Sequence, residues 1–435
     1  MRANYFAYYL VNLSKFIALR LASSNQKTFT RTIIRIATLA VAISLCVMIV
    51  TTALVHGFKR EISEKIYGFW GHINIMDIRA DNSYEALPIT RDAALVEALE
   101  NIADVEVDYG LIGKRALVSN AGVRHVQAVA RIPAIIAIKG SMEGVVIKGL
   151  GTDFDWQTLE KFIVEGEVLN TGDPEKKSEL IISEYTSNRL ELHAGDQVIL
   201  YFLKNDRQIQ RRFTIRGIYR TGLEDYDQKF AMAPLSIVQE LLNWTSQQIG
   251  AYEVFIEDVD DVDLINDYIY LEELPAELYS QTIRSKFPAI FEWLELQDIN
   301  QMVILGLTLI VAIINMISIL LILILERTRM IGLFKALGSR TWLIQKIFLY
   351  HAGMIIVKGM LLGNLAGLSL CLIQQKFRLI TLNEQDYYLS YAPVDINLTY
   401  ILGINAVTLF VIMLFLIVPS LLIARIDPVK TIQFR

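Results

Sequence analysis

The chain has only two cysteines in 435 residues, Cys46 and Cys371, and both fall within long apolar stretches. The polar part of the chain therefore has no disulfide and must be stabilised by its own hydrophobic core. No G-x-x-x-x-G-K-[ST] or G-x-S-x-G motif occurs, and the five histidines lack zinc-ligand spacing. These absences predict that the chain binds no ATP, Mg²⁺ or other metal and is not itself an enzyme.

Charge is missing from the apolar stretches as well. Four windows are each long enough to cross about 30 Å of hydrocarbon as a helix. They are Ile36–Val55, Met302–Leu325, Ile347–Ile373 and Tyr400–Ala424. The first, second and fourth contain no Asp, Glu, Lys, Arg or His. Six Lys and Arg residues precede the first window and no small-residue cleavage site follows it, so we interpret it as a retained anchor and not a signal peptide.

Acidic residues are absent from 1–35 and scarce in 326–346, where five basic residues accompany one acid. The 425–435 tail is also basic, which places these three segments on the cytoplasmic side by the positive-inside rule. The stretch 56–301 has 24 basic and 41 acidic residues, so it should face outward. Its acidity argues against nucleic-acid binding.

The predicted fold is a membrane protein with four transmembrane α-helices, one before and three after a large α+β periplasmic domain. The expected localisation is the bacterial inner membrane. The predicted segments are a cytoplasmic N-terminal segment 1–35, first span 36–55, periplasmic domain 56–301, second span 302–325, cytoplasmic coupling helix 326–346, third span 347–373, periplasmic loop 374–399, fourth span 400–424 and cytoplasmic tail 425–435.

Within the outward domain, period and turn signals predict mixed helices and strands in two subdomains. The clearest helices are Thr90–Asn101, Glu184–Leu190 and Pro234–Trp244, and a hairpin should join 197–203 to 210–219. Four aspartates within Asp258–Asp263 could form a calcium loop, but the segment lacks the glycine and closing Glu of an EF-hand. We therefore favour a solvated turn there.

The third span contains three glycines at four-residue spacing, Gly359, Gly363 and Gly367. This pattern allows close helix packing in lipid, either against the chain's own spans, which we favour, or in a dimer seam. Lys358 and His351 are ionisable groups in the same span. A structural or lumen-facing role is favoured over a proton relay, because no acid occurs in any span.

The segment Glu326–Lys346 reads ERTRMIGLFKALGSRTWLIQK. Helical spacing predicts an amphipathic helix that begins near Arg327 and ends at Gly338-Ser339. The expected apolar stripe comprises Met330, Ile331, Leu333, Phe334 and Leu337, and the polar residues are Arg327, Lys335 and Arg340. Spacing alone leaves open whether this helix is an interfacial anchor or a coupling device.

Several motifs together resemble the FtsX-like permease family, with a MacB-like core domain and closest similarity to its lipoprotein-releasing LolC/LolE branch. The cytoplasmic motifs are ERTRMIGLFKALGSR (Glu326–Arg340) and IARIDPVKTI (Ile423–Ile432). The branch and core-domain motifs are FIALR (Phe16–Arg20), HGFKREI (His56–Ile62), GDQV (Gly195–Val198), FTIRGIY (Phe213–Tyr219) and YDQ (Tyr226–Gln228).

The resemblance implies a permease subunit of a mechanotransmission ABC transporter that extracts lipoproteins from the inner membrane. ATP and Mg²⁺ would be bound by a separate ATPase, and a second permease copy or paralogue would complete the membrane part. The implied ATPase-coupling residues are Arg327, Ile331, Leu333, Phe334, Lys335, Leu337 and Gly338. Met330 stands where the family commonly has an acid. The short 197–219 hairpin leaves docking of a periplasmic carrier by this chain open.

The first and second spans could together hold acyl chains, because both present residues at helical spacing. The expected lipid seam consists of Val41, Leu45, Met48, Thr52, Val311, Asn315 and Ser318. Ordinary contact with membrane lipid is an equal alternative for these residues. Two other functions fit the same family: a MacB-type exporter of soluble periplasmic substrates, and an FtsX-like regulator of cell-wall hydrolases. A membrane-anchored enzyme is the least favoured class.

Overall fold

In the computed structural model of the chain, the described residues are 17–18, 28–80, 87–103, 105–107, 117–119, 122–138, 140–173, 176–204 and 207–427. The chain divides into two compact units. The membrane unit comprises Met1–Lys59, Trp293–Thr381 and Tyr391–Arg435. The α+β unit comprises Arg60–Glu292 and Leu382–Ser390.

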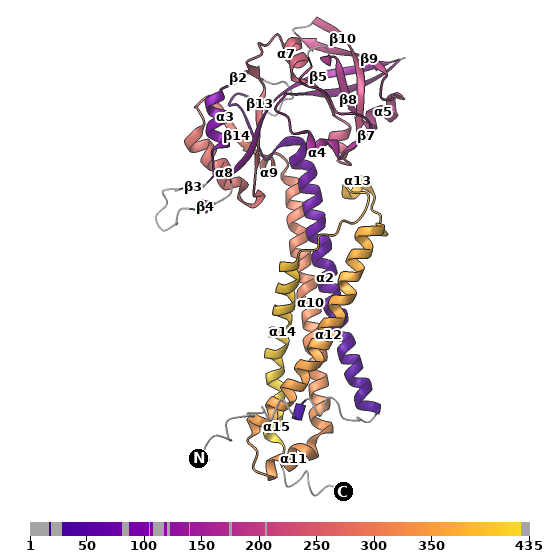
Figure 1. The fold of residues 1–435 in the computed structure, drawn as a ribbon, viewed down its shortest axis with the longest axis vertical. Coiled ribbons are helices and arrows are strands. Elements are labelled where there is room, and N and C mark those ends of the chain that lie inside the picture. Colours follow the sequence, from indigo (N-terminus) through magenta and orange to yellow (C-terminus); the bar gives the residue numbers. More distant parts are fainter. Residues whose placement is uncertain are drawn as a thin grey trace, which may run out of the picture. The chain divides into compact units, whose positions relative to one another are not determined.

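Four long helices dominate the membrane unit and run side by side (Figure 1). They are α2 (Thr28–Trp70), α10 (Pro288–Glu326), α12 (Thr341–Phe377) and α14 (Leu398–Ser420). Each is long and apolar enough to cross a membrane, which confirms the four predicted membrane-spanning helices. Two short helices, α11 (Thr328–Ala336) and α15 (Leu422–Arg425), lie together at one end of the bundle.

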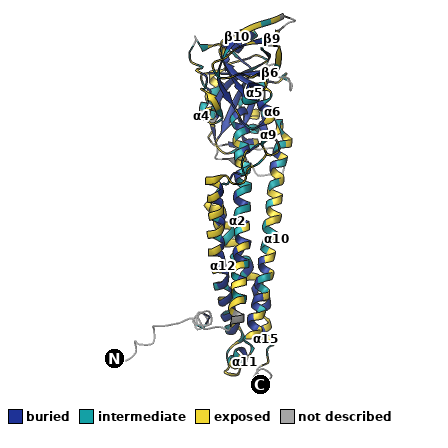
Figure 2. Cartoon of the chain, turned by 90° about the vertical axis from the view of Figure 1, so that its right-hand side faces the viewer, coloured by how far each residue is buried: buried dark blue, intermediate teal, exposed yellow. Residues whose placement is uncertain are grey.

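Much of the bundle surface is apolar and exposed. Only 33–39% of the most apolar window of each long helix is buried inside the chain. Figure 2 shows the exposed residues in yellow along α10 and α12. A surface of this kind is compatible with lipid or with another membrane subunit, and not with water.

The glycines of α12 bring this helix close to α2. A Cβ atom at Gly359 would lie 2.8 Å from the Cβ atom of Val41. One at Gly363 would lie 2.7 Å from the carbonyl oxygen of Ala42, and Gly367 faces the next turn of α2. Real Cβ atoms do not approach other atoms so closely, so only glycine permits this separation of the helices. The glycines therefore pack against the chain's own first span, as favoured from the sequence.

Replacing Gly363 with Val is expected to lower the thermal unfolding midpoint of the detergent-solubilised protein. The new side chain would overlap α2 and cost about 1–3 kcal/mol. Gly403→Val in α14 is the matched control, because no heavy atom lies within 4 Å of a Cβ at that position. Equal shifts of the two midpoints would show that the α2–α12 contact does not depend on Gly363.

The α+β unit contains all the described strands. In chain order its elements are β1 (Ile73–Asp77), β2 (Ile89–Thr90), α3 (Ala93–Glu100), β3 (Val105–Val107), β4 (Leu117–Ser119), β5 (Val123–Ile138), β6 (Ser141–Leu150), α4 (Trp156–Glu160), β7 (Ile163–Gly166), β8 (Glu179–Ser183), α5 (Glu184–Leu190), β9 (Gln197–Lys204), β10 (Arg207–Tyr219), α6 (Glu224–Asp227), β11 (Phe230–Pro234), α7 (Leu235–Leu242), β12 (Gln248–Ile249), β13 (Ala251–Ile256), η2 (Val259–Asp261), α8 (Val262–Tyr268), η3 (Ile269–Glu273), β14 (Leu278–Thr282), α9 (Ile283–Lys286) and α13 (Glu384–Tyr387).

One ten-stranded sheet runs through this unit in the order β14-β1-β13-β5-β6-β11-β8-β10-β7. The tenth strand, β9, pairs with both β10 and β5 and closes a ring of β5, β6, β11, β8, β10 and β9. Strand β5 belongs to both parts: residues 123–129 pair with β13, and residues 135–137 pair with β9. The two predicted subdomains are thus joined by a single shared strand, whose inward residues contribute to one hydrophobic core.

Aspartate side chains cap two helices of the α+β unit. The Asp92 side chain accepts hydrogen bonds from the backbone of Ala94 and Leu95 at the start of α3. The aspartates of 258–263 lie in η2 and at the start of α8, where Asp258, Asp260 and Asp263 are exposed, so the predicted solvated turn is a short 3₁₀ helix at the surface. Asp258 caps η2, and Asp263 lies 3.6 Å from Arg284. Within the described residues, no group of three or more His, Cys, Asp or Glu could hold a metal ion.

Candidate coupling segment and membrane groove

Helix α11 ends where the sequence predicts. Gly338 has φ +84°, a left-handed conformation that favours glycine. The backbone N–H of Ser339 donates to the carbonyl oxygen of Phe334 at 2.9 Å, and that of Gly338 donates to Lys335 at 3.0 Å. This pair of bonds is a Schellman motif, which satisfies the last carbonyl groups of the helix. The segment between the second and third long helices is therefore a defined helix.

The apolar residues of α11 do not form one stripe, which corrects the expectation from the sequence. Ile331 is fully buried, and Met330 and Phe334 are half-buried against the core of the bundle. Leu333 and Leu337 are 55% and 73% exposed. These two leucines are four residues apart, so they lie on one side of the helix that the bundle leaves uncovered. The helix thus has one apolar face that packs against the bundle and a second apolar face, with Leu333 and Leu337, that is exposed.

The ammonium group of Lys335, one of the implied ATPase-coupling residues, bonds within the chain. Its Nζ atom donates to the carbonyl oxygens of Ala424, at 3.0 Å, and Ile426, at 2.8 Å. These carbonyls lie at the end of α15, where a cation is favourable. Arg327, the N-cap residue of α11, makes no side-chain cap bond. The lysine joins α11 to the chain segment that follows the last long helix.

An apolar groove of about 660 Å³ lies between α2, α10 and α14. Most of its lining comes from the following residues: Met48, Met302, Leu305, Gly306, Leu309, Gly403, Ile404 and Val407. A polar group lines one end, comprising Thr52, His56, Asp298, Gln301, Thr399 and Tyr400. The groove is therefore amphipathic, with a long apolar body and a polar end, and its volume is in the range of known ligand pockets.

Three contacts organise the polar end. Lys59 Nζ lies 2.5 Å from the carboxylate of Asp298 and links α2 to α10. Gln301 Nε2 donates to Thr52 Oγ1 at 3.3 Å, which is a second link between these helices. The rings of His56 and Tyr400 stack at 4.2 Å between centroids, which links α2 to α14. All three helices are thus connected at the polar end of the groove.

The residues of the predicted lipid seam lie in different environments. Met48 and Thr52 line the groove, whereas Val41 and Leu45 are buried under the glycines of α12. On α10, Val311 and Ser318 are exposed and Asn315 is half-buried, and these three are not among the described groove residues. The α10 lining comes from Met302–Leu309, nearer the start of the span. Gln301 and Asp298, polar residues just before the apolar run, were the available signal for that position.

The ionisable residues of the third span also separate. His351 is buried, whereas Lys358 is exposed on the surface of α12.

Helices α12 and α14 are joined by a pair of amide side chains that the sequence did not indicate. Asn364 Nδ2 donates to Asn405 Oδ1 at 2.7 Å, and Asn405 Nδ2 donates back at 2.9 Å. Reciprocal amide bonds of this kind hold α12 to α14 in an apolar environment.

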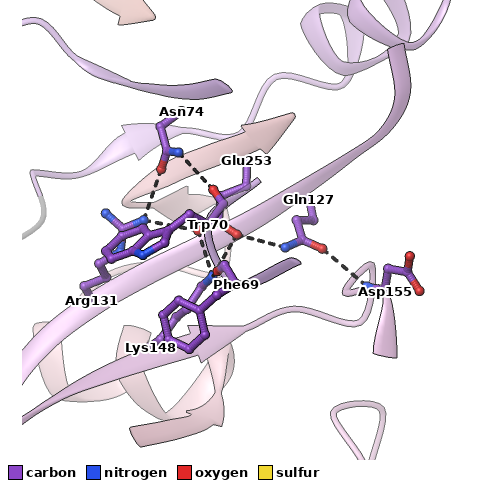
Figure 3. Close-up of polar contacts among 8 residues, drawn as sticks. All are labelled: Phe69, Trp70, Asn74, Gln127, Arg131, Lys148, Asp155 and Glu253. Carbon is purple, nitrogen blue, oxygen red and sulfur yellow. Dashed lines mark hydrogen bonds and ion pairs between the residues drawn. The ribbon is translucent and has the colours of Figure 1, made fainter. Parts of the chain in front are cut away.

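The α+β unit has a buried ionic network centred on Glu253, which is fully buried (Figure 3). Lys148 Nζ lies 2.8 Å from its carboxylate, and Arg131 Nη2 lies 3.1 Å from it. Gln127 Nε2 donates to the same group at 2.9 Å. The four residues come from β13, β6 and β5, so the network fastens three neighbouring strands of the sheet.

The same network holds the end of α2, as Figure 3 shows. Lys148 donates to the carbonyl oxygen of Phe69, and Asn74 Nδ2 donates to that of Trp70 at 2.9 Å. Lys286 lies 4.1 Å from the Trp70 ring. Burial lowers the pKa of Lys148 to about 8 and that of Lys286 to about 7, because desolvation disfavours the ammonium form. Only the position of Lys148 within the apolar run GVVIKGL hinted at this network.

Comparison with known proteins matches both parts of the chain. The FtsX-like permease C-terminal family matches residues 302–428, and the MacB-like periplasmic core domain matches residues 36–269. The chain is 22% identical to the lipoprotein-releasing system transmembrane protein LolE of Haemophilus influenzae, over 97% of this chain and all of that protein. It is 20% identical to LolC of the same organism, over 97% of this chain and 99% of that protein.

Among solved structures, the periplasmic region of MacB from Actinobacillus actinomycetemcomitans aligns with 51% of this chain and 92% of its own. The identity is 11% and the TM-score is 0.33. A similarity this low adds nothing to the fold beyond the family match.

Proposed function

Because the chain belongs to the FtsX-like permease family and has a MacB-like periplasmic core domain, we propose that it is the membrane subunit of a lipoprotein-releasing ABC transporter of the bacterial inner membrane. A separate ATPase would bind ATP and Mg²⁺, and a second permease copy or a paralogue would complete the membrane part. The full-length similarity to both LolE and LolC supports the lipoprotein-releasing branch over the exporter and regulator alternatives.

The observation that carries the proposal is the exposed apolar face of α11, formed by Leu333 and Leu337. Leu333 and Leu337 are exposed at the end of a membrane bundle, in a segment between two spans that the positive-inside rule places in the cytoplasm. Exposed apolar side chains on a short basic helix fit a protein partner better than water. The opposite face, through Ile331, packs into the bundle core. A partner that presses on the leucines would therefore displace the bundle helices.

The groove supports a lipidated substrate. Acyl chains need an apolar cleft, and the polar head of a lipoprotein anchor needs polar partners at one end. The groove between α2, α10 and α14 offers both, with Met302 and Leu305 in its body and Asp298 and Gln301 at its end. Its polar end is on the side of the bundle where α2 and α10 continue into the α+β unit.

The proposal is tested by reconstituting the permease with its ATPase in liposomes that contain a triacylated lipoprotein. ATP should release the lipoprotein to a soluble acceptor, and a non-hydrolysable analogue should not. Absence of release under conditions where the complex hydrolyses ATP would contradict the proposal. A stable complex with an adaptor and an outer-membrane channel would instead favour the exporter alternative.

Filling the groove should block release without stopping ATP hydrolysis. Gly306 lies on the groove wall, and no heavy atom lies within 4 Å of a Cβ at this position. Gly306→Trp should lower the release rate by at least about tenfold, which corresponds to a loss of roughly 1.4 kcal/mol of substrate binding. Ala366→Trp, on the exposed surface of α12, is the control and should retain release. Equal rates for the two variants would remove the groove from the substrate path.

A further inference from the structure

A short segment between the third and fourth spans belongs to the α+β unit and not to the membrane unit. This segment, Leu382–Ser390, is here called the strap. It contains the single turn α13 and is closed by a hydrogen bond of 3.0 Å from the Leu382 N–H to the Ser390 carbonyl oxygen. The sequence predicted only a periplasmic loop over 374–399. The strap is therefore a folded part of the α+β unit, although its two ends lead to α12 and α14.

The strap is held by α2 and by the turn after β10. Lys65 Nζ, on α2, donates to the carbonyl oxygen of Tyr388 at 2.9 Å. Leu389 is 4% exposed, so the strap also buries an apolar side chain. Gly222 approaches closely: a Cβ atom there would lie 3.2 Å from the Tyr388 carbonyl oxygen and 3.1 Å from Lys65 Nζ. The lysine, the strap carbonyl and the glycine thus meet at one point.

The turn that receives the strap is itself fixed by Asp227. The Asp227 carboxylate accepts hydrogen bonds from the Thr221 hydroxyl at 2.7 Å, the Thr221 N–H at 3.2 Å and the Gly222 N–H at 3.0 Å. Gly222 has φ +75°, which favours glycine. This arrangement gives the YDQ motif at Tyr226–Gln228 a physical role. Its aspartate shapes the surface on which the strap lies.

The connections from the strap to the spans are short and ordered. Gln374, in the last turn of α12, accepts a hydrogen bond from the Ile380 N–H at 3.0 Å and donates one to the Ala392 carbonyl oxygen at 2.9 Å. The chain entering the strap and the chain leaving it are thus bound by the same side chain. Few residues separate these bonds from the strap itself, so the connecting segments can extend very little.

We propose that Lys65 is a positioning residue that fastens the strap to the α+β unit, so that movement of the third and fourth spans reaches this unit directly. This inference rests on the proposed function, because it concerns how motion driven by ATP arrives at the outward domain. Without the strap contact, only α2 and α10 would join the spans to the α+β unit. With it, all four long helices are connected to that unit.

The test compares Lys65→Met, which removes the donor, with Lys65→Arg, which keeps one. Lys177→Met, at an exposed lysine of the same unit, is the matched control. In the reconstituted full-length complex, Lys65→Met should accelerate amide hydrogen exchange in 382–390 by about tenfold and leave β8 and β10 unchanged. It should also lower the lipoprotein released per ATP hydrolysed by at least about threefold, and Lys65→Arg should restore part of both.

Unchanged exchange in 382–390 would overturn the strap contact. Faster exchange with an unchanged ratio of release to hydrolysis would overturn the positioning role. If Lys65→Met does not fold, Lys65→Gln gives the same comparison, because its shorter side chain would not reach the Tyr388 carbonyl oxygen that Lys65 Nζ contacts at 2.9 Å. Failure of the wild-type complex to release lipoprotein would count against the proposed function alone, since the exchange experiment does not depend on release.

Discussion

Replacing both Leu333 and Leu337 with Asp is expected to abolish ATP-driven release. Two charges on the exposed face of α11 would lose their water when the ATPase binds. Buried unpaired charges of this kind commonly cost several kcal/mol of binding free energy. Binding of the ATPase to the detergent-solubilised permease should weaken by at least about a hundredfold, which corresponds to roughly 2.7 kcal/mol. Phe334 is unsuitable for this test because it packs against the bundle core.

The control for this experiment is Leu271→Asp in the α+β unit. Leu271 is 58% exposed and Leu333 is 55% exposed, so the same substitution is made in a comparable environment. The control variant should bind the ATPase as the wild type does. Wild-type affinity in the Leu333 and Leu337 double variant would show that this face of α11 is not the ATPase contact.

Glu253→Gln is expected to have the largest effect on the stability of the α+β unit. The carboxylate is fully buried between Lys148 and Arg131, and Lys286 adds a third cation to the same cluster. Removing this carboxylate leaves the buried Lys148 without its ion pair, which typically costs about 3–5 kcal/mol. The loss should appear as a lower midpoint in urea unfolding of the full chain, followed by the fluorescence of its five tryptophans, one of which is Trp70.

The matched control is Glu257→Gln, at an exposed glutamate just beyond the end of β13. A surface substitution of this kind should change the unfolding free energy by less than about 0.5 kcal/mol. If Glu253→Gln were equally mild, the network would not fasten the end of α2 to the sheet. The aromatic contacts of Phe69 and Trp70 would then anchor the end of α2.

Local patterns predicted much of the fold. Long apolar runs, three of them free of charge, identified the four spans because lipid admits few ionised groups, and they did so without information on packing. Helix α5 matches its predicted range because Ser183 supplies the N-cap at its start. Gly338 likewise ended α11 as predicted, since a left-handed residue is required there. In each case the signal lies within a few residues of the structure it sets.

Features that depend on distant residues were not predictable. Leu333 and Phe334 are adjacent and equally apolar, and only the position of the bundle places one outside and the other inside. Closure of the ring through β9 and β5 joins residues more than 60 positions apart. The apolar run around Lys148 indicated that this lysine is buried, but nothing in the sequence indicated that Glu253 is its partner. The groove similarly depends on α14, whose apolar residues are spread all around the helix and do not show which side faces α2 and α10.

Cysteine labelling tests most directly whether an ATPase acts from the cytoplasm on the exposed face of α11 that contains Leu333 and Leu337. A Leu337→Cys variant, with Cys46 and Cys371 replaced by Ala, would be treated with a membrane-impermeant thiol reagent. The account predicts labelling in inside-out vesicles, little labelling in intact spheroplasts, and protection when the ATPase is bound. Labelling from the periplasmic side, or labelling that the bound ATPase does not reduce, would contradict it.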